Sequence, residues 1–362
     1  MRPTSSLVLL IVLFAANACA SLCSVDDAGR VQCDVAAPSQ PEAPSSASGV
    51  AASFRAPPPA PAPAPPPAKA AEKVDSFPRL FNSCRCKHGH LLYYPTDFII
   101  SASLATYGEW TEGEVYLYRD ILKAGDTVLD VGAHVGTMTL PLARIVGPSG
   151  RVLAFEPQRL VFRLLEANVA LNSLVNVETY NALLGDEQVA EVAVPEIDPT
   201  ARGNMGAFSQ PQFQQTRDGE PLLDSDGQQL SMLGVNYVPQ MTIDTLRVDR
   251  VDFIKLDVEM MEEAVLAGAA QVLDRDAPII YMEHHPMRTE HNHLQPLLFR
   301  KYRFFFHSAP YFNPDNFAGK QENIFNVHGR SHNLLCVPPS RLAAVEHVIR
   351  GLQELNIVNM DE

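Results

Sequence analysis

The stretch that most constrains the fold is DTVLDVGAHVGTMTL, which runs from Asp126 to Leu140. Its apolar run Thr127–Val131 has the length and continuous hydrophobicity of a strand buried on both faces of a parallel sheet. Two glycines follow, at positions 132 and 136, and a helical pattern begins at the second of them. A strand, a glycine-bearing turn and a helix in this order usually bind a nucleotide, so the stretch predicts a nucleotide-binding α/β domain.

From Leu91 onward, apolar runs alternate with helical patterns, which predicts a mostly parallel sheet covered by helices. After the third expected strand, a segment of about 186–240 that is rich in Gln, Gly, Asp and Pro interrupts the alternation. Insertions of this length are usually functional or disordered. The expected strands are Thr127–Val131, Arg151–Glu156, Val175–Tyr180, Val251–Asp257, Pro278–Glu283, Tyr302–His307 and Asn333–Val337, and the expected helices are Gly136–Val146, Arg159–Asn172, Glu259–Leu273 and one capped by Ser340 that runs to about Leu355.

The first twenty residues have the pattern of a secretory signal peptide. Arg2 precedes the apolar run Leu7–Ala16, and the small residues ACA at 18–20 suit cleavage before Ser21. We therefore expect residues 1–20 to be removed and the protein to enter the secretory pathway, as a lumenal or secreted protein. The alternative is an uncleaved signal anchor that tethers the protein to a membrane, although the run is short for a bilayer span. No later segment is long and apolar enough for a membrane helix.

Residues 21–74 are expected to form a low-complexity stalk rich in Pro and Ala, followed by the folded domain at 75–362. Its core is PPPAPAPAPPPA, Pro57–Ala68. Proline-rich chain is extended and semi-rigid, at ~3.1 Å per residue, and cannot form a packed core. A ligand for a proline-binding module is the alternative interpretation of this segment.

The formal net charge of -14 bears on the choice of partner. Binding to nucleic acid or anionic lipid depends on Lys and Arg side chains that meet phosphates. We therefore expect a small-molecule or carbohydrate partner and no nucleic acid. The oligomeric state has no signature in the sequence.

The motif CRCKHGH places Cys84, Cys86, His88 and His90 at alternate positions. On one strand all four side chains would share a face and could hold zinc. Structural zinc sites usually have C-x2-C spacing, however, so we assign no metal. The favoured interpretation is an edge strand whose cysteines are free or disulfide-bonded.

The other cysteines are interpreted from their surroundings. Cys19 leaves with the signal peptide, and Cys23 and Cys33 could pair in an oxidising compartment. Cys336 lies in an apolar run and is expected in the core.

Four expected strands end in a carboxylate: Asp130, Glu156, Asp257 and Glu283. Ligands of open α/β sheets bind outside the carboxyl ends of the strands. One such carboxylate is often only a solvated residue or a helix cap. Several along one sheet edge predict a binding site.

The loop DVGAHVG lacks the third glycine of the dinucleotide motif G-x-G-x-x-G. A carboxylate at Asp130 is unfavourable beside a phosphate but suits an α-ammonium group, and Gly132 and Gly136 let the backbone approach a ligand. Glu156 comes twenty residues after Gly136, where a carboxylate can accept both hydrogen bonds of a ribose diol. A ligand with an amino-acid head, a ribose diol and no phosphate is S-adenosylmethionine. Asn181, just past the third strand, is expected at the adenine edge.

At this point the chain resembles the FkbM family of S-adenosylmethionine-dependent methyltransferases, from about His88 to Val337. The resemblance rests on the blocks YYPTDFIISASLATYGEW, GDTVLDVGAHVGTMTLPLA, GRVLAFEPQ, IDTLRVDRVDFIKLDVEMMEEAVLAGA, PIIYMEHH and YFNPDNFAG…NIFNVHGRSHNLLCVP. It implies a Rossmann-like class I methyltransferase fold with a seven-stranded, mostly parallel sheet. It also implies cofactor contacts by the loop Asp130–Gly136, by Glu156 and near Asp257, with the YGE block and its Glu109 folding over the methionine end.

Two residues depart from the family pattern. His134 stands where the glycine loop commonly has Asn, and Met260 stands where KLDVE is commonly followed by Gly. His134 would place a charge beside the cofactor. Met260 would fill space beside the fourth strand and alter the acceptor pocket.

The reaction that the resemblance implies is O-methylation of a small molecule or sugar. It requires in-line positioning and a general base, for which Asp257, Glu283 and His284 are the candidates. Asp257 with Glu259 could instead hold a divalent cation that binds an acceptor diol. The rival functions are a nicotinamide-dependent oxidoreductase, which the missing glycine disfavours, and a non-catalytic binding module on the same fold, of which His134 and Met260 would be signs.

The insertion is expected to form a lid over the acceptor pocket, with Asn204–Phe208 at its edge. It begins after the third strand, so both of its ends return to the carboxyl edge of the sheet. A mixture of flexible polar residues with Met205, Phe208 and Phe213 suits a segment that orders over a ligand. The alternative is a surface loop without a role.

Overall fold

The computed structural model describes residues 23–25, 31–33, 80–207, 209–215, 220–223, 229–284, 292–326, 329–355 and 357. The chain divides into two units, residues 1–72 and 73–362. In the first unit, strands β1 (Cys23–Val25) and β2 (Val31–Cys33) pair antiparallel, with Cys23 opposite Cys33. The expected signal peptide and the proline-rich core of the stalk lie outside the described residues. Among the described helices, none has the length and apolar character needed to cross a membrane.

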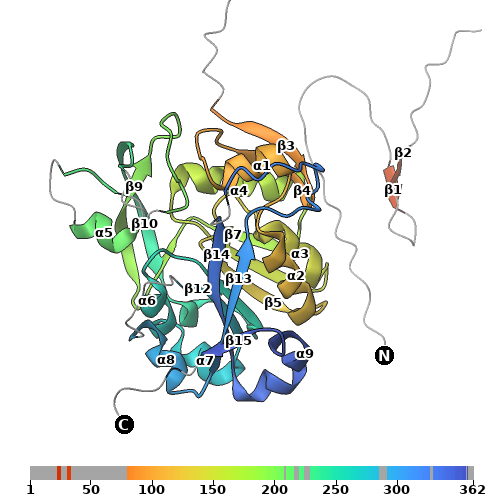
Figure 1. Cartoon of the computed structure of the whole chain (residues 1–362), viewed down its shortest axis with the longest axis vertical. Helices are drawn as coiled ribbons and strands as arrows, with labels where there is room; N and C mark the ends of the chain where they lie inside the picture. Colours follow the sequence, from red (N-terminus) through yellow and green to blue (C-terminus); the bar gives the residue numbers. More distant parts are fainter. Residues whose placement is uncertain are drawn as a thin grey trace, which may run out of the picture. The chain divides into compact units, whose positions relative to one another are not determined.

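The second unit is built on an eight-stranded sheet in the order β15-β13-β14-β12-β11-β5-β6-β7 (Figure 1). Strand β14 runs antiparallel to both of its neighbours, and the strands from β12 to β7 run parallel to one another. The seven expected strands are all present. Their bounds are β5 Thr127–Val131, β6 Arg151–Phe155, β7 Val177–Tyr180, β11 Phe253–Leu256, β12 Ile279–Glu283, β13 Arg303–Pro310 and β14 Arg330–Val337.

The eighth strand, β15 (Gln353–Leu355), corrects the expectation of a seven-stranded sheet and of a C-terminal helix to Leu355. It pairs antiparallel with β13, with Leu355 opposite Phe304. The helical part is a 3-10 helix, η3 (Pro339–Val345), and one turn of α-helix, α9 (Glu346–Ile349). Ser340 does not cap it, because the chain enters through Pro338 without a side-chain cap hydrogen bond.

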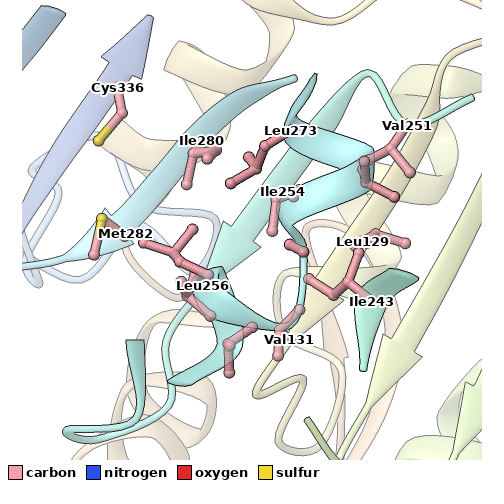
Figure 2. Close-up of a cluster of buried hydrophobic side chains, with 14 of the residues drawn as sticks. Leu129, Val131, Ile243, Val251, Ile254, Leu256, Leu273, Ile280, Met282 and Cys336 are labelled. Atoms are coloured by element: carbon pink, nitrogen blue, oxygen red, sulfur yellow. The ribbon is translucent and has the colours of Figure 1, made fainter. Parts of the chain in front are cut away.

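The central strands are buried on both faces, which explains their continuous apolar runs. Alternate residues enter two different clusters: Leu129 and Val131 lie in one, and Val128 lies in the other. Figure 2 shows the first cluster, where side chains from β5, β11 and β12 meet those of the helices that cover this face. Successive side chains of a strand point to opposite faces of the sheet, so a single strand contributes residues to both clusters.

Helices cover both faces of the sheet. One core packs against the helices that follow β10 and β11, and the other packs against α2, α3 and η3. The helical elements are α1 Ile100–Tyr107, α2 Glu112–Ile121, α3 Thr139–Val146, α4 Arg159–Leu171, η1 Ile243–Thr245, α6 Glu262–Ala267, α7 Ala270–Asp276, η2 Asn292–Leu294 and α8 Gln295–Leu298.

The single helix expected at Glu259–Leu273 is wrong, because two short helices, α6 and α7, occupy this stretch. Glu259 and Met260 adopt positive φ angles of 47° and 80°, which no α-helix contains, so the first helix begins later. Gly268 separates the two helices, and a Cβ there would collide with the carbonyl oxygen of Gly185.

The insertion after β7 folds as a small sheet of its own. Strands β8 (Leu183–Leu184), β9 (Val189–Ile197) and β10 (Met232–Met241) pair in the order β8-β10-β9, and α5 (Gln210–Gln215) lies between β9 and β10 in the chain. Its buried side chains pack against α4 in one hydrophobic cluster. The insertion is therefore docked on the main sheet's helical layer rather than free of it.

The motif CRCKHGH forms a hairpin of β3 (Asn82–Cys86) and β4 (Gly89–Tyr93), not one strand. The turn places the two histidines after the cysteines' strand, and Cys84 and Cys86 are joined in a disulfide, so neither offers a thiolate to zinc. Asn168 of α4 holds the hairpin by accepting from Leu92 N and donating to Leu92 O. Cys336 is a free, fully buried thiol, which confirms the expected core residue.

Candidate cofactor and active site

A cavity of about 570 Å³ opens at the carboxyl ends of β5, β6, β11 and β12. Its wall includes Gly132, Glu156, Asp257 and Glu283, which follow or end these four strands. The volume is that of a site for a ligand of drug or cofactor size. The position is the one that open α/β sheets use for ligands.

The glycine loop after β5 reaches the cavity through Gly132 and not through Gly136. Gly132 has a φ of 81°, and a Cβ there would collide with the carbonyl oxygen of Asp257. Gly136 has a φ of 91°, and its Cβ position faces Leu165 of α4 rather than the cavity. The first glycine therefore lets β5 and β11 meet at the site, whereas the second lets the loop pack on α4.

Glu156 lines the cavity directly after β6, where the sequence places it. Its Oε2 accepts a hydrogen bond from His134 N at 3.0 Å, and its Oε1 accepts one from Gln158 N at 2.8 Å. Burial raises the pKa of Glu156 to about 7, and the two backbone hydrogen bonds only partly oppose this effect. The carboxylate is thus held rigidly, with lone pairs left for two further donors.

Asp130 does not line the cavity, which corrects its expected contact with a cationic ligand group. Its side chain is fully buried, and Thr139 Oγ1 donates to Oδ2 at 2.6 Å. Lys255 Nζ lies 3.5 Å from Oδ1. Thr139 and Lys255 therefore interact with the carboxylate that we expected to bind a cationic group of the ligand.

Lys255, which was not expected from the sequence, is a buried cation beside the cavity. Its Nζ lies 3.2 Å from Asp257 Oδ2 and donates to Gly132 O at 3.3 Å. Burial alone would lower the pKa of Lys255, but the carboxylates of Asp257, Asp130 and Glu114 outweigh it and hold the pKa above its ordinary value. The signal in the sequence was the lysine in the otherwise apolar stretch FIKL, since buried lysines need partners.

Three carboxylates gather close to one another near Lys255. Asp257, Glu259 and Glu283 each offer an oxygen, and the three oxygens lie within 4.8 Å of one another. Burial, and then the charge of Asp257, raises the pKa of Glu283 to about 8. Oxygen donors so arranged are those that a hard divalent cation prefers, although Lys255 already neutralises part of their charge. His284, the remaining expected catalytic residue, lines the same part of the cavity.

Glu114 of α2 also lines the cavity and was not expected there. Its carboxylate accepts from Ser331 Oγ at 2.6 Å and from Tyr118 OH at 3.1 Å. Burial raises the pKa of Glu114 to about 7. The sequence feature that could have indicated its burial is its position four residues before Tyr118, which places both on the buried face of the helix.

Two residues expected to touch the cofactor have structural roles instead. Glu109 accepts from Asn313 Nδ2 at 2.7 Å and from Phe317 N at 2.9 Å, so it anchors the loop after β13. Asn181 donates to the carbonyl oxygens of Glu156 and Pro157 at 2.8 and 3.0 Å. Neither residue lines the cavity. Their neighbours Trp110 and Ala182–Leu184 line it in their place.

His134 lines the cavity and has a φ of 49°. Burial lowers the pKa of His134 to about 4, so the ring is neutral near pH 7 and brings no charge to the site, contrary to expectation. The carboxylate of Asp97 lies 3.9 Å from its Nε2. Met260 does not fill the pocket either: its side chain is exposed, and Met261 lines the cavity.

The sheet order, with β14 inserted antiparallel between β13 and β12 and a ligand cavity at the strand ends, defines a Rossmann-like class I methyltransferase fold. Residues 130–306 match the Methyltransferase FkbM domain. This match agrees with the resemblance of the sequence blocks to the FkbM family.

Relatives by sequence match only parts of the chain. Methyltransferase 1 of Beauveria bassiana is 26% identical over 149 residues, which are 39% of this chain and 57% of that protein. The 23S rRNA (uracil(1939)-C(5))-methyltransferase RlmD of Acinetobacter baylyi is 46% identical over 61 residues, or 17% of this chain. The chain covers 13% of this protein and 17% of the same enzyme from Psychrobacter arcticus.

Among solved structures, the methyltransferase FkbM of Methylobacillus flagellatus aligns with 59% of this chain and 44% of its own, at 15% identity and a TM-score of 0.36. A transferase of Pyrococcus horikoshii aligns with 72% of this chain and 71% of its own, at 14% identity and a TM-score of 0.38.

Proposed function

We propose that the protein transfers a methyl group from S-adenosylmethionine to a hydroxyl oxygen of a small molecule or sugar. The observation that carries this proposal is that the cavity's carboxylates lie on opposite sides of β5. Glu156, fixed by backbone N–H groups and free to accept from a ribose diol, follows β6 on one side of β5, which we call the donor half. Asp257 and Glu283 follow β11 and end β12 on the other side, which we call the acceptor half, and Glu114 interacts electrostatically with Asp257.

S-adenosylmethionine supplies a methyl group already activated by the positive charge of its sulfur. The protein must hold the acceptor oxygen in line with that group, exclude water and accept a proton, and positioning of this kind is worth roughly 7–11 kcal/mol. The cavity wall is formed by buried strand ends and by the insertion, which favours a dry site.

Asp257 is the general base in this proposal. Its Oδ2 lies 3.2 Å from Lys255 Nζ, whereas Glu283, with a pKa of about 8, is mostly protonated at pH 7 and suits the role of a hydrogen-bond donor. A base so placed adds about 10²–10⁴-fold to the rate. Two alternatives remain for this part of the site. His284 could accept the proton instead, or a divalent cation held by the three carboxylates could orient a diol of the acceptor.

The acceptor half also favours a small neutral molecule over a nucleic acid. Trp110 and Tyr311 line the cavity as a stacked pair with ring centroids 4.6 Å apart, and aromatic rings of this kind suit a sugar ring or a planar molecule. The described lining residues present several carboxylates and one guanidinium, that of Arg330. Such a wall would repel phosphates.

The test combines binding with turnover in the full-length protein. We expect calorimetric titration to show binding of S-adenosylmethionine and S-adenosylhomocysteine but not of NAD. With methyl-labelled S-adenosylmethionine, Asp257→Asn should lose methyl transfer to hydroxylated acceptors and keep its affinity for S-adenosylhomocysteine. Binding of NAD would indicate the oxidoreductase. Binding of S-adenosylhomocysteine without turnover on a broad panel of sugars and phenols would indicate the non-catalytic module.

A further inference from the structure

The hairpin of β3 and β4 carries a pair of cysteines that the proposed reaction does not use. Cys84 and Cys86 are joined in a disulfide, with their Cα atoms 5.6 Å apart, and both belong to the single strand β3. Residues two apart on a strand point to the same face, so the crosslink runs along β3 and fastens it to no other element. A crosslink that closes so short a loop contributes little to stability, and the fold does not depend on it.

The two cysteines differ in their exposure. Cys84 is partly exposed, whereas Cys86 is only 5% exposed. Arg85, which lies between them in the chain, is exposed and places positive charge beside the pair. Exchange between a thiol and a disulfide requires access to one sulfur, and nearby positive charge favours the thiolate. Cys84 is therefore the residue of the pair that a dissolved thiol can approach.

The pair is packed together with side chains of the cavity wall. Cys86 and Leu104 are buried members of one hydrophobic cluster, and Cys84, Ile100 and Trp110 pack against it. Ile100 and Trp110 also line the cavity. Two unbonded sulfur atoms need more room than a bonded pair, and a close-packed cluster transmits such a change to its neighbours. Breaking the disulfide should therefore alter the surroundings of Trp110.

We propose that Cys84–Cys86 is a thiol–disulfide exchange site, and that its redox state is transmitted to Trp110 in the cavity wall. The co-reactant is a small monothiol of the glutathione class. This inference goes beyond the proposed function and does not depend on it, because the exchange involves neither S-adenosylmethionine nor an acceptor.

The exchange takes place in two steps. A thiolate of the monothiol attacks Cys84 Sγ, the bond between the two cysteines breaks, and Cys86 leaves as a thiolate that takes up a proton. A second thiolate then attacks the monothiol sulfur of the mixed disulfide, which releases Cys84 as a thiolate that is protonated in turn. Two electrons pass from two monothiols to the protein, and the two monothiols leave as one disulfide. Oxidised monothiol reverses both steps.

The experiment titrates the oxidised full-length protein with mixtures of reduced and oxidised glutathione, without denaturant. We expect the pair to be reduced and reoxidised reversibly, and alkylation followed by mass spectrometry should find thiols at Cys84 and Cys86. Trp110 is the single tryptophan of the chain, so its fluorescence reports on this cluster alone. Its emission should shift along the same titration curve as the alkylation. The melting temperatures of the oxidised and reduced proteins should agree within a few degrees.

Two variants of the full-length chain identify the cysteines responsible. Cys23→Ser/Cys33→Ser keeps the pair on β3 and should titrate as wild type does. Cys84→Ser/Cys86→Ser lacks the pair, and its emission should not respond to glutathione. A response in the second variant would assign the shift to other cysteines and overturn the inference.

Two results with wild type alone would also contradict it. If Cys84 and Cys86 resist glutathione until urea unfolds the protein, the pair is not an exchange site. If the pair exchanges but the emission of Trp110 stays the same, its redox state is not transmitted to the cavity wall. Neither result bears on the binding of S-adenosylmethionine, so the proposed function would stand in both cases.

Discussion

The ammonium group of Lys255 lies 3.5 Å from the carboxylate of Asp130, and both side chains are buried below the glycine loop. Lys255 also donates to Gly132 O, so one cation joins the end of β5, the loop and β11. This contact explains why the carboxylate nearest to the loop cannot serve the ligand. It also gives the site a rigid base, because a buried charge is stable only beside its partner.

Breaking this pair should therefore destabilise the protein strongly. We expect Lys255→Met to lower the free energy of unfolding by roughly 3–5 kcal/mol, because the buried Asp130 loses its ion-pair partner. Urea unfolding measures the change, with Lys123→Met, an exposed lysine, as the control. The double variant Asp130→Asn/Lys255→Met should recover much of the lost stability. A double-mutant cycle that shows no coupling free energy between the two residues would contradict the pairing.

Glu156→Gln should weaken binding of S-adenosylhomocysteine. The amide keeps the size of the side chain but provides one acceptor atom in place of two, so about 1.5–3 kcal/mol of binding free energy should be lost. Glu166→Gln, an exposed carboxylate on α4, is the matched control. Equal affinities of the two variants in calorimetric titration would remove Glu156 from the site.

The same carboxyl group should make binding depend on pH. The pKa of Glu156 is about 7, and ribose hydroxyls that donate to the carboxylate favour its ionised form. Affinity for S-adenosylhomocysteine should therefore rise from pH 6 to pH 8, with release of a proton on binding. Titrations in buffers of different ionisation enthalpy detect that proton, and the signal should vanish in Glu156→Gln.

Protonation of Glu283 should make the free energy of unfolding decrease as the pH rises. Its pKa in the folded state, about 8, lies above the ordinary value of 4.5, so the folded protein binds the proton more tightly than the unfolded chain. The stability that this proton confers is complete below about pH 4.5 and is lost as the pH rises through 8. Relative to wild type, Glu283→Gln should thus gain roughly 2–4 kcal/mol between pH 5 and pH 9 in urea unfolding.

Met260 should be replaceable by glycine with a gain in stability. Its φ of 80° lies in the left-handed region, and the side chain is more than half exposed, so its burial offsets little of the backbone strain. We expect Met260→Gly to stabilise the protein by about 0.5–1 kcal/mol, the left-handed penalty less the entropy that glycine loses on folding. Met260→Ala retains the strain and serves as the control in thermal unfolding.

The sequence predicted the sheet better than the site. Continuous apolar runs such as Thr127–Val131 identify strands buried on two faces, and their alternation with helices sets the parallel order. The carboxyl edge followed from that order, which is why Glu156, Asp257, Glu283 and His284 were placed at one cavity.

The errors in the site came from the direction of side chains, which spacing does not determine. Asp130 and Glu109 are neighbours in the sequence of residues that line the cavity. Their side chains nevertheless contact Lys255 and Asn313 and do not line it. Glu114 was missed because it belongs to a helix outside the strand ends. Long-range contacts of this kind arise only when the chain is folded.

The disulfide between Cys84 and Cys86 closes a loop of only three residues within β3, so it joins no two elements of the fold. The hairpin is held instead by Asn168 and by the hydrophobic cluster around Leu91 and Tyr93. A crosslink over so short a loop removes little freedom from the unfolded chain. Recombinant production of this domain should therefore succeed in a host with a reducing cytoplasm, without an oxidising compartment or an isomerase.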